Sequence, residues 1–386
     1  MTRLRILLGC DTFSPDINGA ARFAERLAAG LTERGHDVHV AAPSKTHRAH
    51  RTYSELIEGQ TLTVHRLASW RMPIHEWLRF VLPWTARRKA RRVLDSVQPD
   101  VVHIQSHIVI GRALAAEAKR RGIRVIATNH VMPENIVDLW AMPRFVRKAI
   151  VRWGWQDVNH VLRGADAVTT PTQRAAHYLE RNTGRTGVRP ISCGIDSSQY
   201  TAQLGQREQQ RVVFVGRITQ EKHVDVIIRA VARLPESVAL DLVGQGDQLP
   251  QLEKLAAELG VADRVVFHGK VSDEHLRSCL TGATVFAIAS TAELQSIATL
   301  EAMASGLPVV AADAMALPHL VDGNGALFTP GNDAELAERI SEILALPDAE
   351  YRRLQQASLK NIEAHDIDRT LDVFESLYRG TETSAA

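Results

Sequence analysis

The sequence predicts an α/β protein with two doubly wound domains in series. Short apolar runs, typical of buried strands, alternate with longer segments whose apolar residues recur at helical spacing. This alternation stops around residues 190–200 and then begins again. The chain has 386 residues, enough for two or three domains that each bury a core. Because strand and helix alternation produces a parallel sheet covered by helices, we expect one such sheet in each half.

The N-terminal half opens with an apolar strand pattern at residues 4–9. A helix pattern follows, with Phe23, Leu27 and Leu31 on one face and Gly35 where the helix is expected to end. The other strands predicted in this half are at residues 38–42, 100–104, 125–128 and 167–169.

The C-terminal half resumes the pattern with a strand at 211–215 and a helix at 224–234. The other strands predicted in this half are at residues 239–243, 265–268, 285–289 and 308–311. We therefore expect an N-terminal domain over 1–190 and a C-terminal domain over 195–364, with a last helix at about 365–380 that packs back on the first domain. Ligands of doubly wound sheets bind beyond the carboxyl ends of the strands, so the cleft between the domains is the predicted site.

Composition excludes several classes of protein. Cys10, Cys193 and Cys279 lie far apart without a CxxC pair, which argues against a disulfide scaffold and leaves zinc and thioredoxin-like chemistry without support. No run of 18 apolar residues is present, so neither a membrane span nor a cleaved signal peptide is expected. These features favour a cytoplasmic protein.

The net charge of +2 conceals an asymmetry between the two halves. Residues 1–189 carry 30 Lys and Arg against 16 Asp and Glu, whereas the remainder carries 16 basic and 28 acidic residues. All six tryptophans also lie in the first half. A basic half rich in tryptophan and an acidic half suggest two domains that face different partners.

The loop after the strand at 211–215 is the first candidate binding site. Gly216 and Arg217 follow this strand directly, and Lys222 comes five residues later. Two cations at the carboxyl end of a parallel strand can neutralise a diphosphate, and a glycine lets the backbone approach it closely. The alternative interpretation is an ordinary basic loop.

Two glutamates, Glu293 and Glu301, frame the second candidate segment. If its second part is helical, free backbone N–H groups near Ile297 suit a phosphate, and each carboxylate can accept hydrogen bonds from hydroxyl groups. The alternative is a solvated helix face. The small and apolar residues around Glu301 weaken that alternative, because burial of an unpaired carboxylate is costly.

The N-terminal half offers His130 and Gly19, each at a predicted strand end. An imidazole at His130 can donate a hydrogen bond or handle a proton, although a purely structural histidine is the more common case. Gly19 stands at a phosphate-approaching turn between strand and helix, but the GxGxxG pattern of dinucleotide-binding dehydrogenases is absent.

Taken together, these residues resemble the family 4 retaining glycosyltransferases of GT-B fold, in which two Rossmann-like domains face a cleft. The resemblance rests on Asn18-Gly19, on Gly216-Arg217 with Lys222, and on Glu293-x7-Glu301 with the following residues up to Pro308. It spans nearly the whole chain in the right order. Residues 128–135, Thr-Asn-His-Val-Met-Pro-Glu-Asn, further resemble the branch that includes bacterial diacylglycerol glycosyltransferases.

The resemblance implies a role for each candidate residue. The donor, a UDP-hexose or GDP-mannose, is held mainly by the C-terminal domain, with Arg217 and Lys222 on the diphosphate and Glu301 on the ribose. Glu293 contacts the donor sugar, and the backbone after it, near Ile297, holds phosphate. His130 matches the histidine that lies close to the reacting sugar. Gly19 matches the glycine loop that closes over donor and acceptor. No metal or other cofactor is implied.

This sequence departs from the family pattern at two places. Leu294, Gln295 and Ser296 stand where small, glycine-rich residues are common, and Cys193 precedes Gly194 where asparagine is common. These departures concern the identity of the donor rather than the fold.

The acceptor is predicted from the basic N-terminal domain. Tryptophans and cations are interleaved over 70–92 and again over 140–155. This pattern is typical of a surface that binds anionic membranes, although the tryptophans could instead pack in the core. We therefore expect a hexosyltransferase on the inner face of the plasma membrane that acts on a lipid such as diacylglycerol, without nucleic acid as a partner. The alternatives are a soluble or cell-envelope precursor acceptor, an epimerase of the same fold, and a catalytically silent membrane scaffold.

Overall fold

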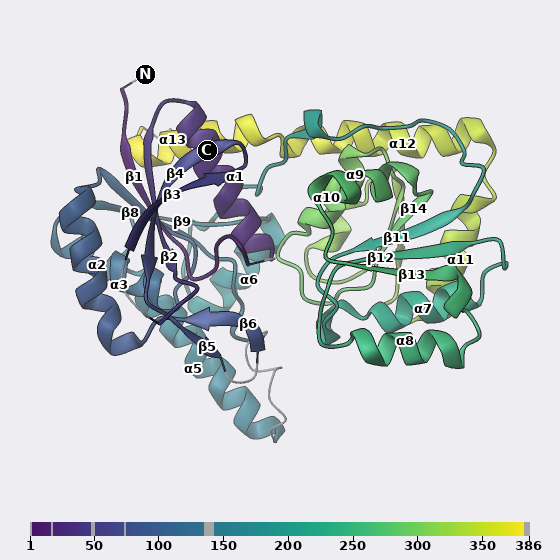
Figure 1. Ribbon diagram of the computed structural model, residues 1–386, viewed down its shortest axis with the longest axis horizontal. Coiled ribbons are helices and arrows are strands. Elements are labelled where there is room, and N and C mark those ends of the chain that lie inside the picture. The colour runs from purple at the N-terminus through teal and green to yellow at the C-terminus, as the bar shows by residue number, and fades with distance from the viewer. Residues whose placement is uncertain (1, 17, 48–50, 73–74, 135–142, 382–386) are drawn as a thin grey trace. The chain divides into compact units, whose positions relative to one another are not determined.

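The structure is a computed structural model that describes residues 2–16, 18–47, 51–72, 75–134 and 143–381. The side chains of residues 72–78 lie outside this description. The chain divides into two compact units (Figure 1). Unit 1 contains the described residues of 1–192 and 368–386, and unit 2 contains residues 193–367. Each unit is built on its own parallel sheet covered by helices, which confirms the predicted fold class.

The sheet of unit 1 has the strand order β10-β9-β8-β7-β1-β2-β4-β3, and only β3 runs antiparallel to its neighbour. A separate pair, β5 and β6, forms a small antiparallel ribbon. The strands of unit 1 are β1 (Arg5–Gly9), β2 (Asp37–Pro43), β3 (Arg51–Ile57), β4 (Gln60–Leu67), β5 (Trp70–Met72), β6 (His75–Phe80), β7 (Val101–Ile104), β8 (Arg124–Thr128), β9 (Ala167–Thr170) and β10 (Arg189–Pro190). The polar residues of β3 to β6 lack apolar runs, so these strands were not predicted, and neither was the two-residue β10.

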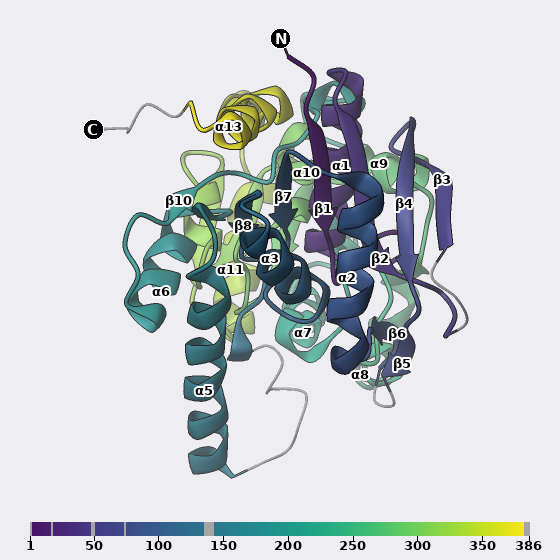
Figure 2. The same ribbon diagram turned by 90° about the vertical axis from the view of Figure 1, so that its left-hand side faces the viewer.

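The helices of unit 1 cover both faces of this sheet (Figure 2). They are α1 (Gly19–Glu33), α2 (Pro83–Val97), α3 (Ile110–Arg120), α5 (Arg144–Leu162), α6 (Gln173–Thr183) and α13 (Ile367–Arg379). Phe23, Leu27 and Leu31 of α1 are buried, as their spacing predicts. The chain order reverses beside β1, whose neighbours are β2 and β7, and such a reversal is where doubly wound sheets bind ligands.

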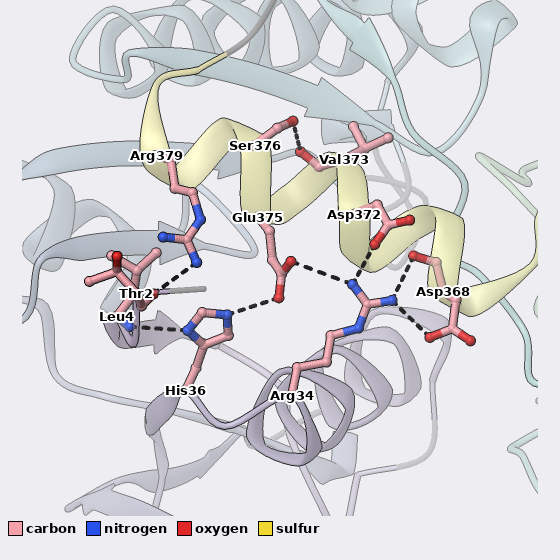
Figure 3. A network of polar contacts seen from close by, with 10 residues as sticks. All are labelled: Thr2, Leu4, Arg34, His36, Asp368, Asp372, Val373, Glu375, Ser376 and Arg379. Carbon is pink, nitrogen blue, oxygen red and sulfur yellow. Dashed lines mark hydrogen bonds and ion pairs between the residues drawn. The ribbon is translucent and has the colours of Figure 1, made fainter.

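The helix α13 packs on unit 1 through a network of charged residues (Figure 3). The Arg34 guanidinium bonds Asp372 at 2.6 Å and Asp368 at 2.8 Å. His36 Nδ1 accepts the backbone N–H of Leu4 at 3.1 Å, so Nε2 carries the proton that it donates to the buried Glu375 at 2.8 Å. These bonds tie α13 to the ends of α1 and β2.

The sheet of unit 2 has the order β13-β12-β11-β14-β15-β16 and is parallel throughout. Its strands are β11 (Arg211–Val215), β12 (Ala239–Val243), β13 (Val265–Gly269), β14 (Val285–Ile288), β15 (Val309–Ala312) and β16 (Gly325–Phe328). The chain order reverses between β11 and β14, so the loops after these two strands are the expected ligand-binding loops.

The helices of unit 2 and their connections complete the fold. The α-helices are α7 (Val224–Ala232), α8 (Leu249–Glu258), α9 (Asp273–Gly282), α10 (Ile297–Ala304), α11 (Asp333–Leu344) and α12 (Asp348–Ile362). The short 3-10 helices of this unit are η1 (Ser197–Gln199), η2 (Gln220–Lys222), η3 (Ala262–Arg264), η4 (Leu317–Leu320) and η5 (Glu363–His365). Within the described part of the chain, none of the helices combines the length and apolar character that crossing a membrane requires.

Candidate functional site

In unit 2, three glycines bring two loops into backbone contact at the carboxyl ends of β11 and β12. The Gly216 N–H donates to the Val243 carbonyl at 3.0 Å, and the Ile218 N–H donates to the Gln245 carbonyl at 2.9 Å. A Cβ atom on Gly244 would lie 1.7 Å from the Gly216 carbonyl oxygen, and one on Gly246 would lie 1.9 Å from that of Ile218. The pair Gly244 and Gly246 therefore shapes the loop that carries Arg217, a role that the sequence pattern did not reveal.

The two predicted cations of this loop are each paired with a carboxylate. Arg217 Nη2 lies 3.2 Å from Glu221 Oε1, and the Thr219 hydroxyl donates to the same oxygen at 2.7 Å. Lys222 Nζ donates to Glu293 Oε1. The structure thus brings Lys222 and Glu293 together, although they are 71 positions apart in the sequence.

Glu221 is the member of this cluster that sequence reasoning missed. Burial opposes its ionisation, but the Thr219 hydrogen bond and the charges of Arg217 and Lys222 outweigh burial, so the pKa of the Glu221 carboxyl is lowered. Its backbone carbonyl accepts the Ser290 hydroxyl at 3.2 Å and the Thr291 N–H at 3.3 Å. Glu221 therefore fastens the loop after β11 to the loop after β14.

The second predicted segment forms the start of α10. The Ser296 hydroxyl accepts the Thr299 N–H at 3.2 Å and caps the helix, which leaves Ile297 as its first residue. The first N–H groups of a helix lack partners within it and favour an anion. Glu301 lies in the body of α10 and is only 4% exposed, which excludes the solvated helix face that we considered for it.

The atypical Gln295 has a structural role within unit 2. Its amide oxygen accepts the Cys193 N–H at 2.7 Å. Cys193 is the second position at which the sequence departs from the family pattern. Both side chains are buried. The two departures are therefore linked by one hydrogen bond.

In unit 1, the predicted residues Gly19 and His130 follow β1 and β8, which flank β7 in the sheet. Gly19 is the first residue of α1, and its neighbour Asn18 caps the helix by accepting the Ala21 N–H at 2.9 Å. Because the carboxyl ends of parallel strands lie at one edge of a sheet, both residues belong to the same edge of unit 1.

His130 is a half-buried residue in contact with one polar and one aromatic side chain. Its Nε2 is 3.2 Å from the Gln105 amide oxygen, and its ring packs 4.9 Å from that of Phe23. Burial lowers the pKa of His130 to about 4. The imidazole is therefore neutral near pH 7, and its bond to Gln105 places the proton on Nε2, which leaves Nδ1 as a hydrogen-bond acceptor.

Two other polar residues of unit 1 have structural roles. His103 is fully buried and bonds Tyr378 and Thr128 at 2.7 Å each. Asp11, which the sequence analysis did not single out, accepts the backbone N–H groups of residues 109–111 at 2.8–3.3 Å and so holds the start of α3.

Comparison with known proteins covers nearly the whole chain. Residues 17–199 match the family described as Glycosyltransferase Family 4, and residues 197–361 match the family described as Glycosyl transferases group 1. These two ranges contain every predicted site residue.

Individual relatives support the same assignment. The alpha-monoglucosyldiacylglycerol synthase of Streptococcus pneumoniae is 26% identical over 96% of this chain and 85% of its own length. The MMP alpha-(1->4)-mannosyltransferase of Mycolicibacterium hassiacum is 31% identical over 71% of this chain and 69% of its own. HepE of Anabaena, solved with UDP-glucose, superposes with a TM-score of 0.78 at 19% identity over 98% of this chain and 100% of its own. The chain therefore belongs to the family 4 glycosyltransferases of GT-B fold.

Proposed function

We propose that this glycosyltransferase moves a hexose from a nucleotide sugar to a membrane lipid such as diacylglycerol, with retention of the anomeric configuration. The observation that carries the donor half of this proposal is the cluster of Arg217, Glu221, Lys222 and Glu293 beside the start of α10. HepE, which shares the fold, is solved with UDP-glucose, and the mycobacterial relative is named a mannosyltransferase. UDP-hexoses and GDP-mannose are accordingly the donors to test.

The charges of this cluster suit the reversible binding of a diphosphate. Arg217 and Lys222 are each held by a carboxylate in the free protein, so both are oriented before the donor binds. A diphosphate competes with Glu221 and Glu293 for these cations. Release of Lys222 would let the Glu293 carboxylate accept hydrogen bonds from sugar hydroxyls, which is the contact proposed for it. Glu301 and the N–H groups near Ile297 would hold the ribose and a phosphate.

The proposed reaction is a front-face substitution at the anomeric carbon. The bond from this carbon to the diphosphate oxygen breaks, and the electron pair stays on the diphosphate. The acceptor hydroxyl oxygen bonds the anomeric carbon from the same side, and its proton passes to a phosphate oxygen. Arg217, Lys222 and the helix amides stabilise the growing negative charge, and neutral His130 positions the sugar through Nδ1.

The lipid acceptor is supported by the residues in the first half of α5, the helix labelled in Figure 2. Val146, Ile150 and Trp153 recur at the i, i+4 and i+7 positions of one face, and Phe145 lies outside this face on the side of Arg152. Trp153 is 67% exposed and Phe145 is 76% exposed. The opposite face carries the exposed cations Arg144, Lys148 and Arg152. An exposed indole opposite cations is typical of helices that lie in the interface of an anionic membrane.

The other predicted membrane segment contributes less charge than its sequence suggests. Trp84, at the start of α2, is 78% exposed, but Arg87 and Arg91 of the same helix bond the buried Glu117 of α3. Trp155 is buried in the core, while Trp140 and the side chain of Trp77 lie outside the described residues. The membrane proposal therefore rests mainly on α5.

A donor panel tests the reaction. The purified protein is incubated with UDP-glucose, UDP-galactose or GDP-mannose and with extracted membrane lipids, and products are identified by mass spectrometry and by the anomeric coupling constant in NMR. One glycolipid with the donor's own anomeric configuration is expected. A product of inverted configuration would contradict retention, and consumption of a donor without acceptor would indicate an epimerase.

Vesicle flotation separates the lipid acceptor from the alternatives. Binding to anionic vesicles at moderate salt is expected, and the lack of it would favour a soluble or cell-envelope precursor acceptor. A protein that floats but neither binds nor hydrolyses any sugar nucleotide, and that is indifferent to substitution of Arg217 and Lys222, would instead be a membrane scaffold.

A further inference from the structure

A second cluster in unit 2 brings together three side chains of metal-ligating type. His268 lies on β13, and His275 and Cys279 lie one helical turn apart on α9. One ligand atom from each of the three residues lies within 4.8 Å of the other two. His268 Nδ1 and His275 Nε2 are 3.2 Å apart. None of these residues belongs to the proposed donor site.

The other nitrogen of His268 is fixed from behind. His268 Nε2 lies 2.8 Å from Asp241 Oδ1, and Asp241 is buried on the neighbouring strand β12. Both carboxylate oxygens of Asp241 also bond Arg211 Nη1, at 3.0 Å and 3.1 Å. A carboxylate behind a histidine is the usual outer partner in protein metal sites, because it sets the orientation of the ring and its proton. Here it directs Nδ1 toward His275.

We propose that His268, His275 and Cys279 bind a zinc ion, with water as the fourth ligand. Bonds of about 2.0–2.1 Å to nitrogen and about 2.3 Å to sulfur in a tetrahedral site separate the ligand atoms by about 3.3–3.7 Å. The distance between the two histidine nitrogens is already close to this value. Two imidazoles and a thiolate form a donor set that suits zinc.

An ion at this position would stabilise the contact between α9 and β13. Among its described residues, α9 buries only Leu280, and β13 is an edge strand of its sheet. An ion held by both elements ties a thinly packed helix to that edge. The role is structural, so glycosyl transfer itself needs no metal in this proposal. The ligands escape a search for paired cysteines because one comes from a strand and two from the next helix.

Metal binding by the untagged, full-length protein tests the site. Zinc is titrated in competition with a chromogenic chelator, and the melting temperature is followed in parallel. We expect about one tightly bound zinc per chain and a rise in melting temperature with zinc. His275→Gln and Cys279→Ser should each weaken binding at least tenfold, whereas His177→Gln on α6, whose ring bonds only the exposed Gln173 in the described structure, serves as the matched control and should not change it.

Cobalt substitution provides a readout that does not depend on the variants. Cys10 and Cys193 are buried and Cys279 is partly exposed, so a thiolate-to-cobalt absorption band in the folded wild type reports Cys279. This band decides the question if a variant fails to fold. The proposal is overturned if the folded protein binds no zinc at micromolar concentration, if the band is absent, or if zinc affinity survives both ligand substitutions.

Discussion

The predicted site residues at the strand ends of the two units differ in charge. Unit 2 keeps charges there, with Arg217 and Lys222 each paired to a carboxylate. Unit 1 keeps a neutral imidazole there, since burial lowers the pKa of His130 to about 4. Paired charges can exchange partners with an ionic ligand, whereas a neutral ring can only orient a hydroxyl group. In the proposed mechanism, charge stabilisation therefore belongs to unit 2 and positioning to unit 1.

The net charges of the two units do not follow the charges of these site residues. Most of the basic excess of residues 1–189 lies outside the strand ends, and part of it is neutralised within the unit, as by Glu117, which accepts from Arg87, Arg91 and Arg120. The acidic half, in contrast, carries cations at its strand ends. Net charge per half therefore describes the surface of each unit and says little about its binding residues.

Replacement of Arg217 should give the largest effect. Arg217→Ala removes one of the two cations proposed to stabilise the leaving diphosphate, so kcat/KM should fall by about 10²–10³-fold. Initial rates with the identified donor and acceptor measure it. The matched control is Arg233→Ala, which removes an exposed arginine paired to Asp333 and should leave transfer unchanged. If kcat/KM of Arg217→Ala stays within twofold of wild type, the proposal that unit 2 supplies charge stabilisation is contradicted.

Gly244→Ala tests whether the loop must lie where the glycines place it. The added Cβ would sit 1.7 Å from the Gly216 carbonyl oxygen at a φ of +145°, so the loop carrying Arg217 must move. We expect a loss of about 10²-fold in kcat/KM, together with destabilisation of about 1–3 kcal/mol in chemical denaturation.

Gly260→Ala is the control for this variant. Its φ is +69°, but nothing lies within 4 Å of the new Cβ, so it isolates backbone strain from collision. It should cost about 1 kcal/mol of stability with normal activity. Equal activities for the two variants would show that the position of the loop does not matter.

His130→Ala tests the positioning role of unit 1. Loss of one hydrogen bond to the sugar should lower kcat/KM by about 10–10²-fold. Because the pKa of His130 is about 4, the wild-type rate should show no step from this residue between pH 6 and pH 8. His160→Ala, an exposed histidine of α5, is the control. Wild-type turnover by His130→Ala would contradict the assignment.

The sequence was sufficient for most strands of both sheets, but not for β3, β4, β10 and β16, nor for the partners of the charged residues. Strands such as β11 and β14 are apolar runs, because both faces of a parallel sheet are buried, and this makes them visible in the sequence. The polar strands β3 and β4 at the sheet edge have no such signal. Edge strands alternate between solvent and core, so their composition resembles that of loops.

Some residues of the candidate site could be predicted from the sequence and others could not. Gly216, Arg217 and Lys222 were found because they follow an apolar strand directly. Glu221 lies between them in the sequence yet gave no signal, since a glutamate in a short polar loop is ordinary. Only the fold shows that it bonds Thr219 and Arg217 and fastens two loops together. Pairings that depend on loop geometry are not encoded in residue spacing.

Acid should destabilise unit 1 more than unit 2. Burial lowers the pKa of His103 to about 3 and of His130 to about 4 in unit 1, and of His365 to about 4 in unit 2. An unfolded histidine titrates near 6.5, so the unfolded chain binds more protons below that value. The contribution of these histidines to the free energy of unfolding is therefore fully present above pH 6.5. It is lost as the pH falls toward 4, by up to ~1.4 kcal/mol per pH unit for each residue.

Hydrogen exchange between pH 7 and pH 5, corrected for its intrinsic pH dependence, measures this for each unit. Peptides from the sheet of unit 1 should lose more protection than those from unit 2. Substitution of the exposed His177 should leave the difference intact. Equal losses in both units would mean that His103 and His130 do not decide the acid stability of unit 1.

The smallest effect is expected at the surface of α5. Trp153→Ser removes one exposed indole from its apolar face, so affinity for anionic vesicles should fall by about tenfold or less. Leu259→Ser is the control, because it removes an exposed apolar side chain from unit 2. If the two variants float alike, membrane contact does not distinguish the units. If Trp153→Ser alone binds weakly and its rate recovers with detergent-dispersed acceptor, α5 brings the enzyme to its lipid without entering the chemistry.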